Sequence, residues 1–152
     1  GDVYKRQDNF VAQLNFNSYN RFGKPMQVSD KGISIVYLWS YNGMYPVAEI
    51  KNCTYEQVKN ILGATFIETL LDKSSPTTSE MSSINGLRNR LPNAHINTYT
   101  YSPLVGVTSV TDARGLTTYY TYDSTGRLTE CYILKNGSKQ IVEHYDYHYY
   151  NK

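Results

Sequence analysis

The sequence predicts a mainly β fold of antiparallel hairpins and meanders with a short helical insertion. Tyrosine contributes 16 of the 152 residues, against 4 phenylalanines and 1 tryptophan, and tyrosine suits the half-buried surface of a pleated sheet. Side chains alternate along residues 116–122, with Leu116, Thr118, Tyr120 and Tyr122 on one face of the expected strand. Tight-turn residues recur between such stretches, which indicates short strands joined by hairpins.

A six-residue turn motif occurs twice, as YNRFGK at residues 19–24 and YDSTGR at residues 122–127. Asp or Asn at the first turn position can cap the following amides, and Gly three residues later accepts a left-handed backbone. Residues 112–115, DARG, repeat the turn without the tyrosine. We therefore predict structural turn roles for a set of nine residues: Tyr19, Asn20, Gly23, Asp112, Gly115, Tyr122, Asp123, Gly126 and Arg127.

Two Asn-Gly pairs, Asn42-Gly43 and Asn136-Gly137, predict two-residue hairpin turns. Strands over 127–135 and 138–150 would flank the second pair and complete a C-terminal meander. Cross-strand tyrosine and threonine pairs are expected to hold this sheet together.

Residues 53–92 interrupt the repeat and predict a helical insertion packed on the sheet. Residues 54–57, TYEQ, fit a capping box that opens a helix ending at Gly63. An apolar helical pattern continues over 66–72, a loop over 73–78, and a further helix over 79–91 before Pro92. The expected organisation is therefore β repeat units over 8–52, the insertion over 53–92 and a β meander over 93–152.

The first seven residues, GDVYKRQ, differ from everything that follows. They match what a transposon end used in sequencing-library preparation would encode if translated in frame. We expect residues 1–7 to be foreign to the native protein.

Two clusters are candidate binding sites. Tyr37, Trp39 and Tyr41 alternate on one face before the first Asn-Gly pair, as an aromatic platform for a sugar or a partner would, although a lone Trp in a β protein is commonly buried. His144, Asp146 and His148 alternate along one expected strand and are weak candidate metal ligands. Their spacing along a single strand is wide for one ion, so a solvated face is the simpler interpretation.

Composition and motifs argue against several classes of function. The chain has 15 basic and 13 acidic residues and a net charge of +2, so no basic surface argues for nucleic acid or an anionic membrane. No stretch has the length and apolarity of a membrane helix. The motifs of hydrolases, zinc proteases and phosphate loops are missing, and we predict no enzymatic activity and no cofactor. Cys53 and Cys131 are either two buried thiols or one disulfide.

The Tyr-Asp-x-x-Gly-Arg-Leu signature at residues 122–128 resembles the YD-repeat units of the Rhs family. Tyr101, Tyr122 and Tyr147 are separated by intervals near twenty residues, as are Tyr19 and Tyr41. The stretch YLWSYNGMYPVAEI and the later YTYSPLVGVTSVTDARG are also similar to the C-terminal portion of large YD-repeat proteins from Bacteroidota. The Asp-Pro-x-Gly boundary motif of toxin-carrying members is missing from this sequence.

The resemblance implies a β ribbon that spirals into a hollow shell, in proteins that are secreted or lie at the cell surface. The chain is thus expected to be a structural or interaction segment of such a protein, paired with upstream repeats of the same polypeptide. Two alternatives stay open. One is an adhesion module that binds a glycan or a surface protein through the Trp39 region, and the other is part of a toxin-delivery Rhs protein.

Overall fold

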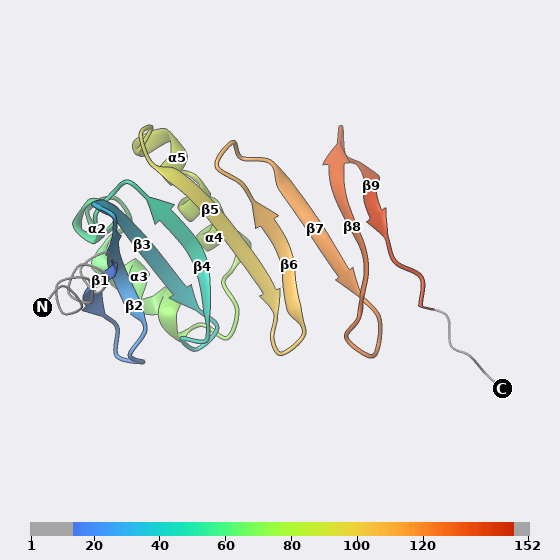
Figure 1. The fold of residues 1–152 in the computed structure, drawn as a ribbon, viewed down its shortest axis with the longest axis horizontal. Coiled ribbons are helices and arrows are strands. Elements are labelled where there is room, and N and C mark those ends of the chain that lie inside the picture. The colour runs from blue at the N-terminus through green and yellow to red at the C-terminus, as the bar shows by residue number, and fades with distance from the viewer. Residues whose placement is uncertain (1–13, 148–152) are drawn as a thin grey trace, which may run out of the picture. The chain divides into compact units, whose positions relative to one another are not determined.

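The structure is a computed structural model that describes residues 14–147 (Figure 1). Residues 1–7, with the predicted foreign start, lie outside this range. The chain divides into two compact units, one up to Asn97 and one from Thr98. The described residues form nine strands and the helices α2 to α5, and consecutive strands within each unit run antiparallel. The predicted fold class, mainly β with antiparallel hairpins and short helices, is confirmed.

The sheet of the first unit is a meander of strands joined by short turns. Its strands are β1 (Leu14–Tyr19), β2 (Pro25–Asp30), β3 (Ile33–Ser40) and β4 (Tyr45–Lys51). Asp30 pairs with Ile33, so Lys31 and Gly32 form a two-residue turn with φ values of 51° and 80°. Positive φ at both positions gives the backbone twist that matches the flanking strands. The sequence analysis did not identify this turn.

The helical insertion follows β4 within the same unit. It comprises α2 (Tyr55–Leu62), α3 (Ala64–Asp72), α4 (Thr78–Asn85) and α5 (Leu87–Arg90). The predicted capping box at Thr54 is present, because its hydroxyl accepts the Gln57 amide while the Gln57 side chain accepts the Thr54 amide. A second capping box joins Thr77 and Glu80. The helix predicted over 79–91 therefore starts one residue earlier, and it is interrupted at Gly86.

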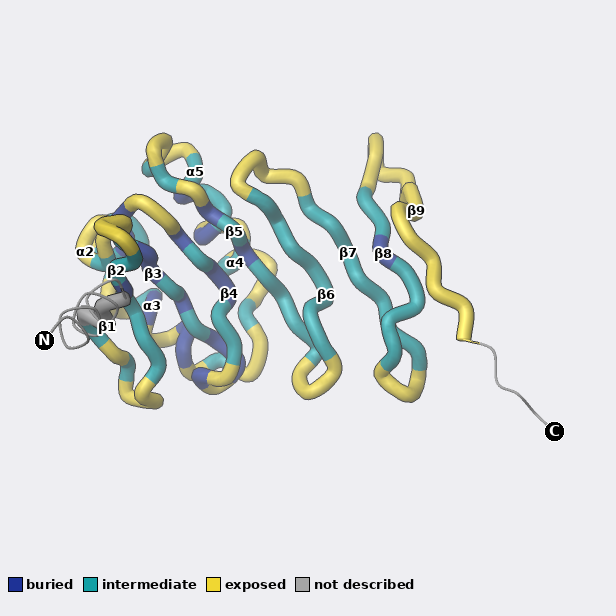
Figure 2. Tube along the Cα trace, in the orientation of Figure 1, coloured by how far each residue is buried: buried dark blue, intermediate teal, exposed yellow. Residues whose placement is uncertain are grey.

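The core of the first unit lies between the sheet and these helices (Figure 2). Strands β3 and β4 contribute Val36, Leu38, Val47, Ala48 and Ile50, which are at most 1% exposed. The helices contribute further residues of the same kind, namely Val58, Leu70, Ile84 and Leu87. Burial of such side chains is worth about 1.5–3 kcal/mol each, so the helices complete a core that the sheet alone would leave open.

The loop between β3 and β4 holds the C-terminal end of α3. Ser40 Oγ donates to the Leu70 carbonyl at 2.7 Å, the Asn42 amide to the Lys73 carbonyl at 2.8 Å and the Gly43 amide to the Leu71 carbonyl at 3.1 Å. The last carbonyls of a helix have no partner within the helix. This loop therefore acts as the C-terminal cap of α3.

The same contacts correct the prediction of a two-residue turn at Asn42-Gly43. Ser40 pairs with Tyr45, so the loop has four residues, Tyr41–Met44. Its first three residues are left-handed, with φ values of 54°, 55° and 76°. This backbone directs two consecutive amides toward the helix, which a two-residue turn would not do.

The second unit is a meander that starts within β5 (His95–Ser102), a strand whose first residues belong to the first unit. It continues through β6 (Gly106–Thr111), β7 (Thr117–Tyr122), β8 (Leu128–Lys135) and β9 (Ser138–His144). Lys135 pairs with Ser138, so Asn136 and Gly137 form the predicted two-residue turn. Strand β9 ends at His144, short of the predicted 150.

Polar and aromatic cross-strand pairs hold this second sheet. Thr111 and Thr117 pair through their hydroxyl groups at 2.8 Å, and the rings of Tyr119 and Tyr132 stack with centroids 5.2 Å apart. Most of its strand residues are half-buried, whereas every residue of β9 is exposed (Figure 2). Among the described residues, no helix has the length and apolarity to cross a membrane.

Candidate functional site

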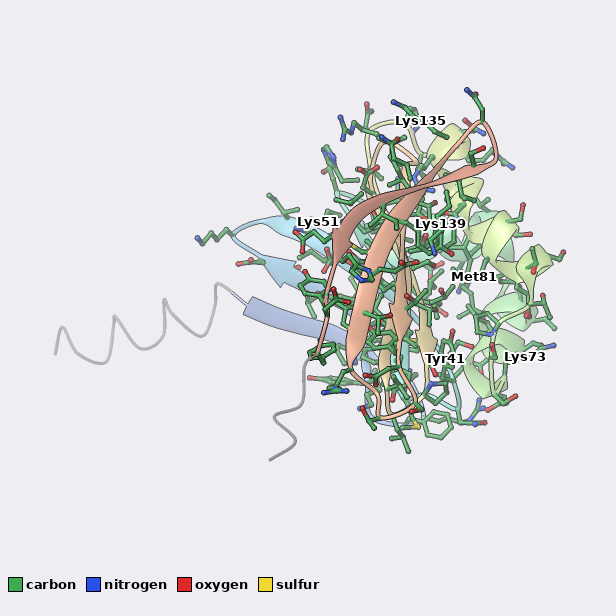
Figure 3. The ribbon with its side chains drawn as sticks, turned by 90° about the vertical axis from the view of Figure 1, so that its right-hand side faces the viewer. Tyr41, Lys51, Lys73, Met81, Lys135 and Lys139 are labelled. Atoms are coloured by element: carbon green, nitrogen blue, oxygen red, sulfur yellow. The ribbon has the colours of Figure 1, made fainter. Side chains whose placement is uncertain are left out.

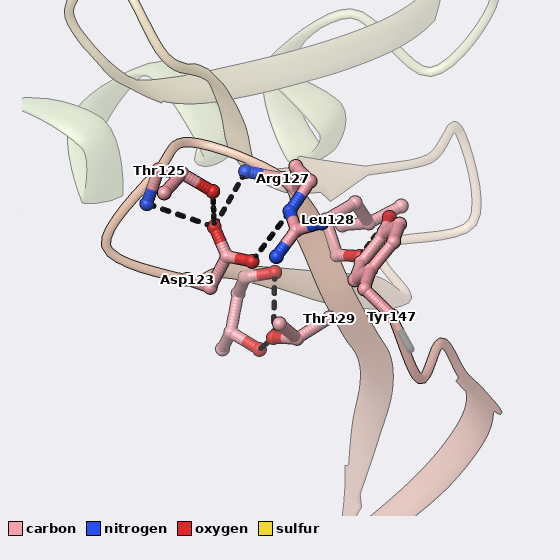
Figure 4. Close-up of polar contacts among 7 residues, drawn as sticks. Asp123, Thr125, Arg127, Leu128, Thr129 and Tyr147 are labelled. Atoms are coloured by element: carbon pink, nitrogen blue, oxygen red, sulfur yellow. Dashed lines mark hydrogen bonds and ion pairs between the residues drawn. The ribbon is translucent and has the colours of Figure 1, made fainter. Parts of the chain in front are cut away.

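The most regular feature of the molecule is a turn built on an Asp or Asn side chain. In the turn at Asp123, Oδ1 accepts the amides of Thr125 and Arg127, both at 2.9 Å, and the Thr125 hydroxyl at 2.8 Å (Figure 4). Two main-chain bonds close the turn, from the Asp123 amide to the Arg127 carbonyl at 2.8 Å and from the Gly126 amide to the Asp123 carbonyl at 3.0 Å.

Four of these bonds, the two from main-chain amides to the side-chain oxygen and the two main-chain bonds, recur in the turns at Asn20 and Asp112. Asn20 Oδ1 accepts the amides two and four residues later at 2.9 and 3.1 Å, and Asp112 Oδ1 does so at 2.9 and 3.0 Å. The main-chain bonds are 2.9 Å long in both turns. Three segments with different intervening residues thus share one geometry because they share the first and fourth positions.

The fourth position is glycine in each turn because its backbone is left-handed. Gly23, Gly115 and Gly126 have φ values of 74°, 84° and 83°. A Cβ atom would meet nothing within 4 Å at Gly23 or Gly115 and only a Val105 methyl at 4.0 Å at Gly126. Glycine is therefore required by conformation rather than by lack of space.

The turn at Asp123 also carries a charge pair. Arg127 Nε donates to Asp123 Oδ2 at 2.9 Å. The amide of Arg127, the Thr125 hydroxyl and this guanidinium together lower the pKa of Asp123 to about 2. Main-chain bonds likewise lower the pKa of Asp112. Both carboxylates are charged at neutral pH and act as hydrogen-bond acceptors.

Two tyrosine hydroxyl groups each bond to a carbonyl near the start of a strand, just after the turn that lies two turns earlier in the sequence. Tyr122 Oη donates to the Val107 carbonyl at 2.7 Å, and Val107 lies just after the turn that joins β5 to β6. Burial raises the pKa of Tyr122, so its hydroxyl keeps the proton that it donates. The hydroxyl rests on Gly106, where a Cβ atom would come within 2.5 Å of Tyr122 Oη.

Tyr147 makes the corresponding contact just after the turn at Asp123. Its hydroxyl donates to the Leu128 carbonyl at 2.6 Å, and the Arg127 guanidinium lies 4.2 Å from the centroid of its ring (Figure 4). Arg127 therefore joins two partners, the Asp123 carboxylate within its own turn and the tyrosine about one repeat later. Such a cation–π contact adds about 0.5–1 kcal/mol at an exposed site.

Tyr19 occupies the tyrosine position of the first turn but differs from Tyr122. It ends β1 and is 55% exposed. The neighbouring Arg21 instead reaches the helical insertion, where it pairs with Glu68 at 2.7 Å and with Asp72. In the first unit the turn thus contacts a helix.

The structure brings together two of the three residues of the predicted aromatic platform. Strand β3 ends at Ser40, and Tyr41 is 2% exposed and packs edge-on against Tyr45 with centroids 5.6 Å apart. Tyr37 and Trp39 do lie together, with centroids 6.4 Å apart. Trp39 Nε1 donates to the Pro25 carbonyl at 2.8 Å, and Lys24 Nζ lies 5.6 Å from the ring centroid. The Trp39 ring therefore packs against neighbouring side chains, and its N–H group has a hydrogen-bond partner.

The predicted metal ligands are only partly within the described range. His148 lies outside it, and Asp146 falls beyond the end of β9. His144 Nε2 and Asp146 Oδ1 are 2.8 Å apart, which is a hydrogen bond between the two candidate ligands. Within residues 14–147, no group of three or more His, Cys, Asp or Glu side chains could hold a metal ion.

Cys53 and Cys131 are both free and buried. Burial raises the pKa of the Cys53 thiol to about 11. The thiolate is the reactive form of cysteine, so Cys53 behaves as a small apolar core residue at neutral pH.

Sequence reasoning missed the contact between the first turn and the β3–β4 loop. The Phe22 ring covers Gly43 so closely that a Cβ atom there would come within 2.4 Å of Phe22 Cδ2. Phe22 stands at a free position of the turn motif, and Gly43 had been assigned only a conformational role. The spacing of 21 residues between them, close to one repeat, was the available signal.

Comparison with known proteins agrees with this geometry. No curated protein matches the sequence. Residues 105–139, which span strands β6 to β8 and the turns at Asp112 and Asp123, match the family model of the RHS Repeat, so the resemblance to the YD-repeat units of the Rhs family is confirmed for this segment.

Proposed function

We propose that the chain is a structural segment of a larger YD-repeat protein of the kind found in Bacteroidota. In this proposal the protein is secreted or exposed at the cell surface. The segment supplies β-sheet to a repeat shell by pairing with upstream repeats of the same polypeptide, and it performs no catalysis of its own.

The observation that carries this proposal is the contact of two tyrosines with strands that begin after the turn two turns earlier. Tyr122 bonds to the Val107 carbonyl and Tyr147 to the Leu128 carbonyl. Each bond ties the start of one strand to a tyrosine that lies beyond the next turn in the sequence, so neighbouring units stabilise each other. This is the energetic pattern of repeat proteins, in which stability comes from interfaces between adjacent repeats.

Exposed strand edges support the same proposal. Strand β9 has β8 as its neighbour in the strand order, and Ile141 and Val142 on it are 52% and 57% exposed. Strand β1 stands at the other end of that order. An exposed strand edge with apolar side chains is a template for further pairing.

The proposal predicts that the chain by itself associates through its edges. Analytical ultracentrifugation should detect concentration-dependent oligomers. Adding the upstream repeats of the source gene should reduce association and raise the melting temperature, because those repeats cover the edge at β1. A monomer that unfolds cooperatively and gains nothing from added repeats would contradict the proposal.

A matched pair of variants tests the other edge, at β9. Val142→Lys places a charge on β9, where it should reduce self-association. Val105→Lys places the same charge on the β5–β6 turn, where Val105 is 43% exposed, and should leave association unchanged.

A glycan-array signal that is lost on Trp39→Ala while the fold is retained would instead support the adhesion module.

A further inference from the structure

We propose that Asn136, in the turn between β8 and β9, is a site of spontaneous deamidation, and that the fold protects the other Asn-Gly pair, Asn42-Gly43, from the same reaction. This inference does not depend on the proposed function. It rests on the different main-chain environments of two identical dipeptides.

The reaction needs only water. The Gly137 main-chain nitrogen loses its proton and attacks the side-chain carbonyl carbon of Asn136, so a nitrogen–carbon bond forms. The side-chain carbon–nitrogen bond then breaks and ammonia leaves, which yields a five-membered succinimide. Water opens this ring at either carbonyl to give aspartate or isoaspartate. The net change is the replacement of the side-chain amide by a carboxylate, with ammonia released.

The Asn136-Gly137 turn is open to this chemistry. Both residues are exposed, and both are left-handed, with φ values of 52° and 78°. A Cβ atom at Gly137 would meet nothing within 4 Å, so no side chain packs over the Cα of this residue. The preceding Lys135, labelled in Figure 3, is the exposed last residue of β8.

The hairpin around this turn is also easy to open. Every residue of β9 is exposed, and Leu134 at the end of β8 is 51% exposed. Segments with few buried contacts open locally at low free-energy cost. Local opening lets the Asn136 side chain and the Gly137 nitrogen reach the geometry that ring closure requires.

Asn42-Gly43 lacks this freedom. The Gly43 amide, which would have to attack, donates to the Leu71 carbonyl at 3.1 Å, and the Asn42 amide donates to the Lys73 carbonyl at 2.8 Å. Gly43 is buried beneath the Phe22 ring. Reaction at Asn42 would require the loop to leave the end of α3, which breaks both bonds together.

Deamidation would change the β8–β9 hairpin in two ways. Either product adds a negative charge at the turn. Isoaspartate also adds one methylene to the main chain, and a two-residue turn cannot take up that length while Lys135 stays paired with Ser138. The hairpin tip should therefore open as the protein ages.

Peptide mapping by mass spectrometry tests the proposal directly. The full chain is incubated at body temperature in neutral and mildly alkaline buffers, and both Asn-Gly peptides are quantified in the same digests. The Asn136 peptide should gain about one dalton with first-order kinetics, faster at the higher pH. It should convert at least about tenfold faster than the Asn42 peptide, because the Asn42 loop opens rarely.

Two controls complete the design. In urea, where the chain is unfolded, both peptides should convert at similar rates, which shows that the fold makes the difference. Asn136→Gly keeps a sequence suited to the same turn and should abolish the mass gain at that peptide. An unchanged Asn136 peptide in the native chain would overturn the proposal, and so would equal rates at the two sites.

Discussion

At the scale of single residues, the three turns separate the role of shape from the role of charge. Like Asp112 and Asp123, Asn20 accepts the main-chain amides two and four residues later in its own turn. A neutral amide oxygen is therefore sufficient to form the turn. The carboxylate of Asp123 adds the ion pair with Arg127. Charge therefore also serves a contact outside the turn, because the Arg127 guanidinium that it holds lies against the ring of Tyr147.

The low pKa of Asp123 predicts a loss of stability in acid. Its pKa falls from 3.8 to about 2 on folding, chiefly through the Arg127 amide. A group with a depressed folded pKa stabilises the protein fully above the unfolded value and loses this effect as the pH falls through the folded value. Chemical denaturation of the wild type should therefore show a loss of stability from about pH 4 down to pH 2.

Variants of the turn residues test whether the Asp123 carboxylate causes this loss of stability in acid. Asp123→Asn keeps the acceptor oxygen and should flatten the acid limb of the profile, whereas Asn20→Asp should steepen it by adding a carboxylate to the same geometry. An unchanged profile in Asp123→Asn would show that the carboxylate of Asp123 contributes no such linkage.

Gly106 supplies a second prediction, because its backbone φ is not left-handed and its role is space for Tyr122. Gly106→Ala should destabilise the second unit by about 1–3 kcal/mol, as overpacking does. The effect should be smaller in a Tyr122→Phe background, where the hydroxyl nearest the new methyl group is gone. Additive losses in this double-mutant cycle would show that the two residues do not interact.

At the scale of elements, the β3–β4 loop and α3 form one cooperative piece. Ser40 is fully buried, and its only role in this arrangement is to donate to the Leu70 carbonyl. Ser40→Ala should lower the free energy of unfolding by about 0.5–1.5 kcal/mol, because one buried hydrogen bond is lost while the Leu70 carbonyl still accepts the Lys73 amide. Ser82→Ala on the exposed side of α4 is the matched control and should change the free energy of unfolding little.

The elements also show what the sequence could and could not predict. The Asp123 turn follows from local chemistry, since its first and fourth residues determine its bonds. The loop at Asn42-Gly43 does not, because α3 supplies carbonyl acceptors that favour four residues over two. Tyr41 does not lie on the predicted aromatic face, because it belongs to this four-residue loop and not to β3. The contacts of Tyr122 and Tyr147 with earlier carbonyls depend on strand register, which composition and spacing do not provide.

At the scale of the whole molecule, burial is unevenly distributed between the two units. In the described residues, nearly all fully buried apolar side chains belong to the first unit, and Cys131 is the buried apolar residue of the second. Hydrogen-bonded cross-strand pairs, rather than a thick core, hold the second sheet. Stability therefore should differ along the chain.

Hydrogen exchange measured by mass spectrometry should show this difference. Peptides from β3, β4 and α3 should exchange slowly, and those from β8 and β9 should exchange faster by at least about tenfold, because they open at lower free-energy cost. Adding upstream repeats should not slow exchange in β9. Equal protection in both units would mean that they unfold as one cooperative body.

The tyrosine contacts also set an order of events during synthesis. The carbonyl of Val107 accepts a hydrogen bond from a hydroxyl 15 residues later in the sequence, and the carbonyl of Leu128 from one 19 residues later. A turn that has just left the ribosome can therefore form its own hydrogen bonds. The bond from the later tyrosine hydroxyl forms only when that tyrosine has also left the ribosome. Folding then advances along the chain in the same direction as translation, with a lag of 15 to 19 residues.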